Sequence, residues 1–166
     1  MSILLAIPIL SIAAILQSAV FSRITLLQGT ADIILLTIIA WALQKKVKTG
    51  WQWGIIGGLL ADFLSGLPFG IFTASYLLTI GIALGLKARI WRFIGLVQLF
   101  TTFIPTILSH GFSLLAIFFP ATTLPLKNVL QSITLPSLML NVFLTIPIFI
   151  LIQELAWQLY PQEIEI

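Results

Sequence analysis

Four long stretches of the sequence contain no aspartate, glutamate, lysine or arginine. An apolar stretch of about 18 residues or more is long enough to cross a lipid bilayer as a single helix. Charged residues make up 8% of the whole chain, whereas a typical soluble domain has about 25%. The sequence therefore predicts an integral membrane protein. The four uncharged stretches are residues 1–22, 63–86, 93–119 and 128–153.

Two shorter apolar segments, residues 33–44 and 49–61, lie on either side of a group of lysines. Neither is long enough to cross the bilayer alone, but Asp32 and Asp62 can lie at or near the outer ends of short spans. We therefore predict an all-α integral membrane protein with six transmembrane helices, forming one polytopic domain over residues 1–166. The predicted spans are approximately residues 2–21, 31–44, 51–66, 69–86, 93–119 and 129–158.

The basic residues indicate how the chain is oriented in the membrane. Cytoplasmic loops of membrane proteins carry an excess of lysine and arginine. If both termini are cytoplasmic, the loops after the second and fourth spans face the cytoplasm and carry six of the eight basic residues. We therefore predict that the N- and C-termini are both inside. The six residues are Lys45, Lys46, Lys48, Lys87, Arg89 and Arg92, and the other two are Arg23 and Lys127.

The tryptophans support the same orientation. Indole rings favour the headgroup region at the edge of the hydrocarbon core. All five tryptophans fall at the predicted cytoplasmic edge, so we expect their rings to lie in that region. They are Trp41, Trp51, Trp53, Trp91 and Trp157.

Small residues recur at intervals of four in the third predicted span. Gly54, Gly58 and Asp62 share one face of this helix because residues four apart lie one above the other. Small residues at this spacing let a second helix backbone approach closely. We therefore expect the third and fourth spans to pack tightly. The fourth span carries a matching stripe at Gly70, Ala74, Gly81 and Gly85.

The third and fourth spans are joined by a short outer connection. Gly66 is expected to end the third helix in the left-handed conformation, and Pro68 suits the first turn of the next helix. Asp62 lies about one turn before this hairpin. A charge at the centre of a bilayer costs about 2.5–3.5 kcal/mol on insertion scales, and less near the interface. Two interpretations stay open: Asp62 holds the hairpin or a neighbouring helix by hydrogen bonds, or it forms part of a partner-binding surface or polar cavity.

Four other polar residues have expected structural roles. His110 lies at a depth similar to that of Asp62, and we expect the two side chains to pair. Asp32 is expected to cap the second span, where the helix dipole favours a negative charge. Asn141 and Gln98 are single amides within spans, which indicates hydrogen bonds between helices.

Several function classes lack support in the sequence. The phosphate-binding motif GxxxxGK[ST] and the hydrolase motifs GxSxG and HExxH are absent. The chain has no cysteine and one histidine, which makes thiolate or histidine metal sites improbable. The net charge of +3 is too scattered to indicate a nucleic-acid partner. We therefore expect no enzymatic activity, no cofactor and no metal.

Two stretches of the sequence resemble the family of the rod shape-determining protein MreD. Residues 16–36, LQSAVFSRITLLQGTADIILL, resemble the end of the family's first helix and the acidic start of its second. Residues 53–70, WGIIGGLLADFLSGLPFG, resemble its glycine-rich helix, aspartate and glycine-containing hairpin. The length and the almost entirely apolar layout are also similar. One position departs from the pattern: Ala31 precedes Asp32 where the family often has proline.

This resemblance implies a non-enzymatic membrane scaffold of the bacterial cell-elongation machinery, which controls rod shape and peptidoglycan synthesis. The implied location is the bacterial cytoplasmic membrane. The implied partners are an MreC-like protein, MreB, a RodA-type glycosyltransferase and a class B penicillin-binding transpeptidase, besides membrane lipid. The fold of the family is similar to that of the six-helix substrate-binding subunits of energy-coupling-factor transporters. The expected contact surface is the third helix with its hairpin, through Gly54, Gly58, Asp62, Gly66 and Gly70.

Two other functions stay open. A vitamin-capturing subunit of a transporter would have polar and aromatic groups around an outward-facing pocket, and a stripe of small residues on its first helix. Ala14 and Ser18 form a weak version of such a stripe. A small proton-coupled carrier would use Asp62 as its proton site.

Overall fold

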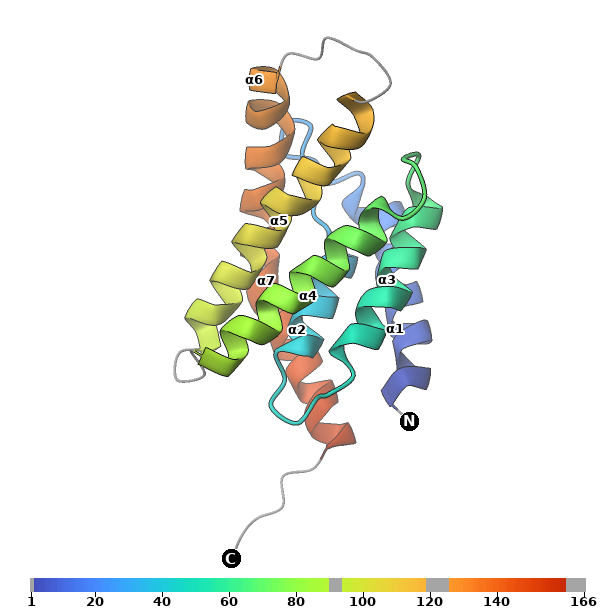
Figure 1. Cartoon of the computed structure of the whole chain (residues 1–166), viewed down its shortest axis with the longest axis vertical. Coiled ribbons are helices and arrows are strands. Elements are labelled where there is room, and N and C mark those ends of the chain that lie inside the picture. Colours follow the sequence, from blue (N-terminus) through green and yellow to red (C-terminus); the bar gives the residue numbers. More distant parts are fainter. Residues whose placement is uncertain (1, 90–93, 119–125, 161–166) are drawn as a thin grey trace, which may run out of the picture.

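The computed structural model describes residues 2–89, 94–118 and 126–160. Within these ranges the chain forms six helical segments and no β-strand (Figure 1). The segments confirm the predicted all-α fold and its number of helices. They are α1 (Ser2–Leu16) with the π-helical turn Gln17–Phe21, α2 (Ile33–Ala42), α3 (Gly50–Leu64), α4 (Ile71–Arg89), α5 (Ile94–Phe118), and α6 (Leu126–Val129) continuing through the π-helical turn Leu130–Thr134 into α7 (Leu135–Leu159).

The length and composition of the helices fit the predicted spans unevenly. Among the residues that the structure describes, three segments are long and apolar enough to cross a membrane: Ile3–Phe21, Ile71–Arg89 and Lys127–Leu159. By contrast, α2 has ten residues. Ten residues of α-helix are about 15 Å long, which is about half the thickness of a hydrocarbon core.

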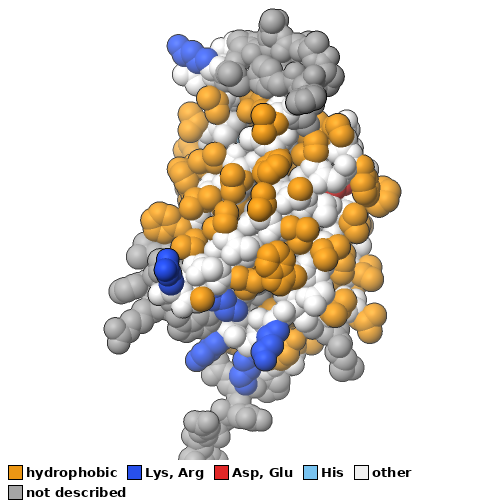
Figure 2. Space-filling view, in the orientation of Figure 1, with side chains coloured by type: hydrophobic (Ala, Val, Ile, Leu, Met, Phe, Trp, Pro, Cys, Tyr) orange, Lys and Arg blue, Asp and Glu red, His pale blue; other side chains and the backbone are white. Residues whose placement is uncertain are grey.

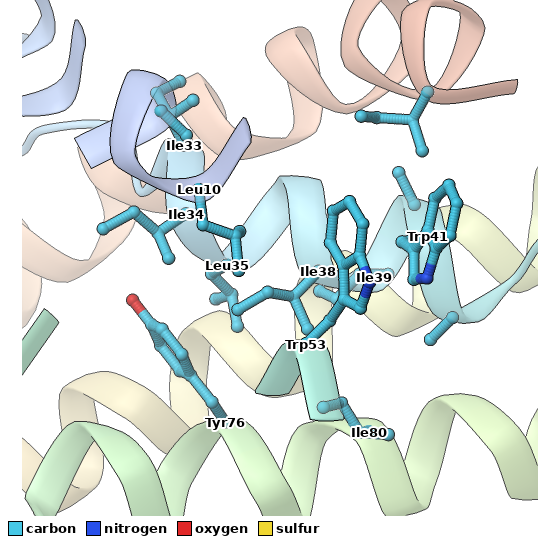
Figure 3. Packing of buried hydrophobic residues seen from close by; sticks show 14 of the residues in the cluster. Leu10, Ile33, Ile34, Leu35, Ile38, Ile39, Trp41, Trp53, Tyr76 and Ile80 are labelled. Carbon is cyan, nitrogen blue, oxygen red and sulfur yellow. The ribbon is translucent and has the colours of Figure 1, made fainter. Parts of the chain in front are cut away.

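This short helix forms the centre of the bundle. Every residue of α2 is buried, and the helix packs against α1, α3, α4, α5 and α7 (Figure 1). Its sequence, IILLTIIAWA, is apolar on all sides. A helix that is hydrophobic all round is stable when it is enclosed by other helices. Figure 3 shows isoleucines and leucines of α2 packed with Leu10, Tyr76 and Ile80 from its neighbours.

Two of the tryptophans belong to this core. Trp41 of α2 and Trp53 of α3 are both 0% exposed, and their rings stack with centroids 4.2 Å apart (Figure 3). The prediction that they lie in the headgroup region is therefore wrong, because α2 is enclosed and Trp53 faces it. Trp51 and Trp157 are 45% and 47% exposed. Trp91 lies outside the described residues.

Most of the basic side chains lie at one end of the bundle. Figure 2 shows hydrophobic side chains spread along the visible face, with most of the visible lysines and arginines towards the lower end and one at the upper end. The loop between α2 and α3 lies at this end and exposes Lys45, Lys46 and Lys48. Arg92 lies outside the described residues. The segregation of charge to the ends leaves the middle of the visible face apolar.

Candidate functional site

Two glycines of α3 bring the neighbouring helix α4 close to it. A Cβ atom at Gly58 would lie 2.5 Å from the Cα atom of Thr73 in α4. A Cβ atom at Gly54 would overlap the side chain of Ile80, also in α4. These contacts confirm the predicted close packing of the third and fourth spans. At Gly58 a side chain would meet the backbone of α4, whereas at Gly54 it would meet the movable end of the Ile80 side chain.

The matching stripe expected on α4 contributes to this packing only in part, because Gly81 faces Trp51 of α3 and Gly85 faces open space. A Cβ atom at Gly81 would be 3.5 Å from the nearest atom, in Trp51, and one at Gly85 would have nothing within 4 Å. The surface of α4 that meets α3 carries Thr73 and Ile80 instead. Larger side chains of α4 therefore fill the space that the glycines of α3 leave open.

Asp62 links the end of α3 to the beginning of α4. Its side chain is 4% exposed. Its Oδ1 atom accepts a hydrogen bond from the backbone N–H of Phe72, at 2.8 Å. Its Oδ2 atom accepts from the N–H and the hydroxyl of Thr73, at 3.2 and 2.6 Å. The first N–H groups of a helix have no partner within the helix. Asp62 therefore caps α4 from a neighbouring helix, which supports the interpretation that it holds the hairpin together.

The hairpin itself reverses at a different glycine from the one expected. Helix α3 ends at Leu64, and Ser65 is already extended, with φ −88° and ψ 150°. The glycine with positive φ in the described chain is Gly70, at 100°, directly before α4. Pro68 lies in the connecting loop and not in the first turn of α4. The predicted roles of Gly66 and Pro68 are therefore wrong, because the chain leaves α3 in an extended conformation and makes its left-handed turn immediately before the next helix.

His110 does not share a contact with Asp62 in the described structure. The hydrogen bonds that Asp62 accepts all come from α4. His110 belongs to α5, which packs against α4, α7 and α2, whereas α3 packs against α4, α2 and α1. The two residues are similar in depth but face different neighbours, so the expected pair does not form.

Asp32 forms a second cap, at the beginning of α2. Its Oδ1 atom accepts a hydrogen bond from the N–H of Leu35, at 3.0 Å, which confirms the predicted capping role. The hydroxyl of Tyr76 in α4 lies 2.9 and 2.8 Å from the two carboxylate oxygens and donates to them. The N–H of Asp32 donates to the Oδ1 atom of Asn141 in α7, at 2.8 Å. Asp32 therefore joins α2, α4 and α7.

Tyr76 is a site residue that the sequence reasoning missed. Its side chain is 0% exposed, and a buried tyrosine hydroxyl usually has a hydrogen-bond partner. The chain has two tyrosines, and Tyr76 is the one inside a predicted span. Its position could have suggested a nearby buried acceptor.

The polar contacts continue from Asn141 between α5 and α7. The Nδ2 group of Asn141 donates to the hydroxyl of Thr106, at 3.0 Å. The Nε2 group of Gln98 donates to the carbonyl and the hydroxyl of Thr145, at 3.0 and 3.1 Å. The hydroxyls of Thr102 and Thr145 lie 2.8 Å apart. The prediction that Asn141 and Gln98 hold helices together is confirmed.

The other end of α2 is closed by a lysine. The Nζ atom of Lys87 donates to the carbonyl oxygens of Ala42 and Gln44, at 3.0 and 2.6 Å. A cation is favoured at the C-terminus of a helix, just as an anion is favoured at the N-terminus. Asp32 and Lys87 thus match the dipole of α2 at its two ends.

A small cavity lies close to Asp32, at the end of the bundle where α2 begins. Its volume is about 320 Å³, near the lower limit for small-molecule sites. The Oε1 atom of Gln17 in its wall accepts a hydrogen bond from the N–H of Ile34, at 3.1 Å. Four of the six lining residues are polar and uncharged. They are Gln17, Ser18, Ser22 and Thr30, with Ala31 and Leu64.

The described residues offer no group of three or more histidine, cysteine, aspartate or glutamate side chains that could hold a metal ion. Comparison of the chain with protein-family models, with curated proteins and with solved structures found no match. The resemblance to MreD therefore rests on the sequence motifs that contain Asp32 and Asp62. Asp32 lies at the beginning of α2, whereas Asp62 lies in the last turn of α3 and its carboxylate accepts hydrogen bonds from the beginning of α4.

Proposed function

We propose that this protein is a non-enzymatic scaffold of the cell-elongation machinery in the bacterial cytoplasmic membrane. It acts through contacts between its helices and those of partner membrane proteins. The sequence motifs around Asp32 and Asp62 support this proposal, and so does the use that the fold makes of both residues. Each carboxylate accepts hydrogen bonds that connect two helices, as expected of residues with a structural role.

Location in a membrane is part of the proposal. Three helical segments are long and apolar enough to cross a bilayer. The basic residues lie mainly at one end, which is the cytoplasmic end if both termini are inside. Large apolar side chains are exposed along the bundle, for example Phe143 at 78% and Leu151 at 70%. Lipid is the solvent in which such a surface is stable.

The observation that carries the scaffold proposal is the exposed tip of the hairpin between α3 and α4. Phe63 and Phe69 are 77% and 62% exposed, and their rings lie edge to face with centroids 5.3 Å apart. Asp62, directly before Phe63, fixes the hairpin by its three hydrogen bonds to α4. The tip is therefore a rigid apolar projection at one end of the bundle. Aromatic side chains on rigid supports are typical anchors of protein interfaces.

This assignment changes the expected contact surface. Gly54, Gly58 and Asp62 are occupied by α4 and support the hairpin from within. Gly66 and Gly70 have open space around them, at the tip. The partner-facing residues are thus those of the tip. Gly54 and Gly58 instead set the close packing of α3 against α4, which supports the tip.

The partners follow from the resemblance to MreD. They are an MreC-like protein, MreB, a RodA-type glycosyltransferase and a class B penicillin-binding transpeptidase. The tip lies at the end of the bundle opposite the lysines of the α2–α3 loop, which is the outer end in the proposed orientation. We take an MreC-like protein as the first partner to test at this surface.

Co-purification with an MreC-like protein tests the proposal. The double variant Phe63→Ser/Phe69→Ser should lose most of the captured partner while keeping its melting temperature, because both rings are exposed. Phe143→Ser is the matched control: it removes an equally exposed ring from α7 and should retain the partner. Equal capture by the wild type and the double variant would contradict the role of the tip, and failure of the wild type to capture the partner would contradict the scaffold.

A vitamin-capturing transporter subunit is the second candidate, and the cavity near Asp32 favours it. The cavity has a volume of about 320 Å³, and its wall includes the side chains of Gln17, Ser18 and Thr30. The stripe on α1 gives less support, because Ala14 is buried inside the bundle and Ser18 is exposed. A water-soluble vitamin that raises the melting temperature in detergent would support this function. A Thr30→Trp variant, which fills the cavity, should abolish the effect.

A further inference from the structure

The loop between α2 and α3 presents three lysines from a fixed backbone. Lys45, Lys46 and Lys48 are exposed, whereas Val47 between them is 5% exposed and belongs to the core. The buried valine anchors the loop against the bundle. The neighbouring lysines therefore extend away from it.

Several contacts hold this loop in place. Lys87 donates hydrogen bonds to the carbonyl oxygens of Ala42 and Gln44, where the loop begins. The indole N–H of Trp41 donates to the hydroxyl of Thr49, at 3.2 Å, where the loop ends. A Cβ atom at Gly50 would lie 3.1 Å from that of Ala42, so the two ends of the loop are packed together. A loop that is already ordered loses little conformational entropy when it binds a ligand.

Other groups at this end of the bundle match the edge of a membrane. Trp51 and Trp157 are each nearly half exposed, and tryptophan prefers the headgroup region. Arg89 at the end of α4 is exposed and adds positive charge. Within the described residues, Glu154, about one turn before Trp157, is the acidic side chain of this end. The net charge here is therefore clearly positive.

We propose that the α2–α3 loop is a binding site for the headgroup of an anionic phospholipid. Lys45 and Lys48 contact the phosphate, and Trp51 lies at the level of the glycerol backbone. This inference rests on the proposed location in a membrane. Lysine attracts phosphate as a compact point charge, and the attraction is screened by salt. The site would link the activity of the scaffold to the anionic lipid content of the inner leaflet.

Quenching of tryptophan fluorescence by brominated lipids tests the site in vesicles. The full chain is reconstituted in phosphatidylcholine with increasing fractions of brominated phosphatidylglycerol, and the relative affinity for the two lipids is obtained from the quenching curves. The wild type should prefer phosphatidylglycerol by at least about fivefold, the effect expected of one lysine near a lipid surface. The preference should fall towards one when the salt concentration is raised to about 0.5 M.

Two charge-matched variants locate the effect. Lys45→Gln/Lys48→Gln should lose the preference, whereas Arg23→Gln/Lys127→Gln, at the opposite end, should retain it. Each double variant lowers the formal charge from +3 to +1, so a difference between them cannot come from net charge. The inference is overturned if the wild type shows no preference, or if both variants change it equally.

The same experiment separates this inference from the proposed location. Flotation of the vesicles shows whether the chain is incorporated at all. A chain that does not float with the vesicles contradicts the membrane proposal, whereas a chain that is incorporated but shows no lipid preference contradicts only the site.

Discussion

Asp62 and Asp32 lie at the same end of the bundle, and each accepts hydrogen bonds at the beginning of a helix, but they connect the chain on different scales. Asp62 reaches forward about ten residues, to Phe72 and Thr73. Asp32 caps its own helix and meets Tyr76 and Asn141, which are 44 and 109 residues further along the chain. One carboxylate fixes a hairpin, and the other fixes the arrangement of three separate helices.

This difference predicts how each site depends on the rest of the molecule. Contacts between residues close in sequence form at a low entropic cost, whereas distant contacts require the whole chain to be arranged first. The Asp62 clamp can form as soon as α3 and α4 are present. The Asp32 junction is complete only when α7 has joined the bundle.

Asp32→Ala should give the largest loss of stability. It removes the cap of α2 and leaves the buried hydroxyl of Tyr76 without its acceptor, at a cost of about 3–5 kcal/mol. Reversible unfolding in mixed micelles measures this loss. A loss no greater than that of Asp62→Ala would contradict the wider role of Asp32.

Asp62→Ala should cost less, about 2–3 kcal/mol, because the N–H groups of Phe72 and Thr73 gain other partners when the hairpin opens. Its effect should be local. Hydrogen exchange should increase at the first turn of α4 and not at the beginning of α2. A uniform increase over both helices would show that the two sites are not separate.

Gly58→Ala should cost about 1–2 kcal/mol, because the new methyl group meets the backbone of α4 and not a movable side chain. Gly85→Ala is the matched control, since a Cβ atom there has open space. The control should be neutral or slightly stabilising, given the higher helix propensity of alanine. Melting temperatures of the two variants measure the difference, and equal losses would contradict the close approach of α3 and α4.

Tyr76→Phe should show a coupling of about 1 kcal/mol with Asp32→Asn in a double-mutant cycle, because the two side chains share hydrogen bonds. With Asp62→Asn it should be additive within about 0.5 kcal/mol. Coupling of similar size in both cycles would show that the Asp32 and Asp62 sites belong to one hydrogen-bond network.

The smallest expected effect is the coupling free energy between His110→Ala and a change at Asp62. Because His110 and Asp62 pack against different neighbours, His110→Ala and Asp62→Asn should be additive within about 0.5 kcal/mol. A clear coupling between the two changes in unfolding free energy would support the predicted contact between Asp62 and His110.

The sequence allowed the helical segments to be predicted better than their contacts. Uncharged stretches and small residues four apart can be read directly along the sequence. These patterns predicted α3, α4 and the close approach of the two helices at Gly58. The sequence patterns do not show which neighbouring helix a given side chain faces. Depth in the bilayer placed His110 level with Asp62, but it did not show that α5 and α3 lie on different sides of the bundle.

The capping residues illustrate the same limit. The role of Asp32 could be predicted because an N-cap is local to its own helix. The role of Lys87 could not, since it closes α2 from a helix that begins some thirty residues later in the chain (Ala42 to Ile71). The left-handed residue of the hairpin was assigned to Gly66 and occurs at Gly70, because both glycines satisfy the same local pattern.

The shortness of α2 has a consequence for how the protein is made. In the proposed membrane setting, a ten-residue segment cannot stay in the bilayer by its own hydrophobicity. Its place is secured by α3, α4 and α7, and α7 begins at Leu135, far later in the chain. During synthesis, therefore, we expect α2 to remain at the translocation machinery or at the membrane surface until the segments that enclose it have been inserted. Truncation before α7 should leave it accessible to water-soluble labels.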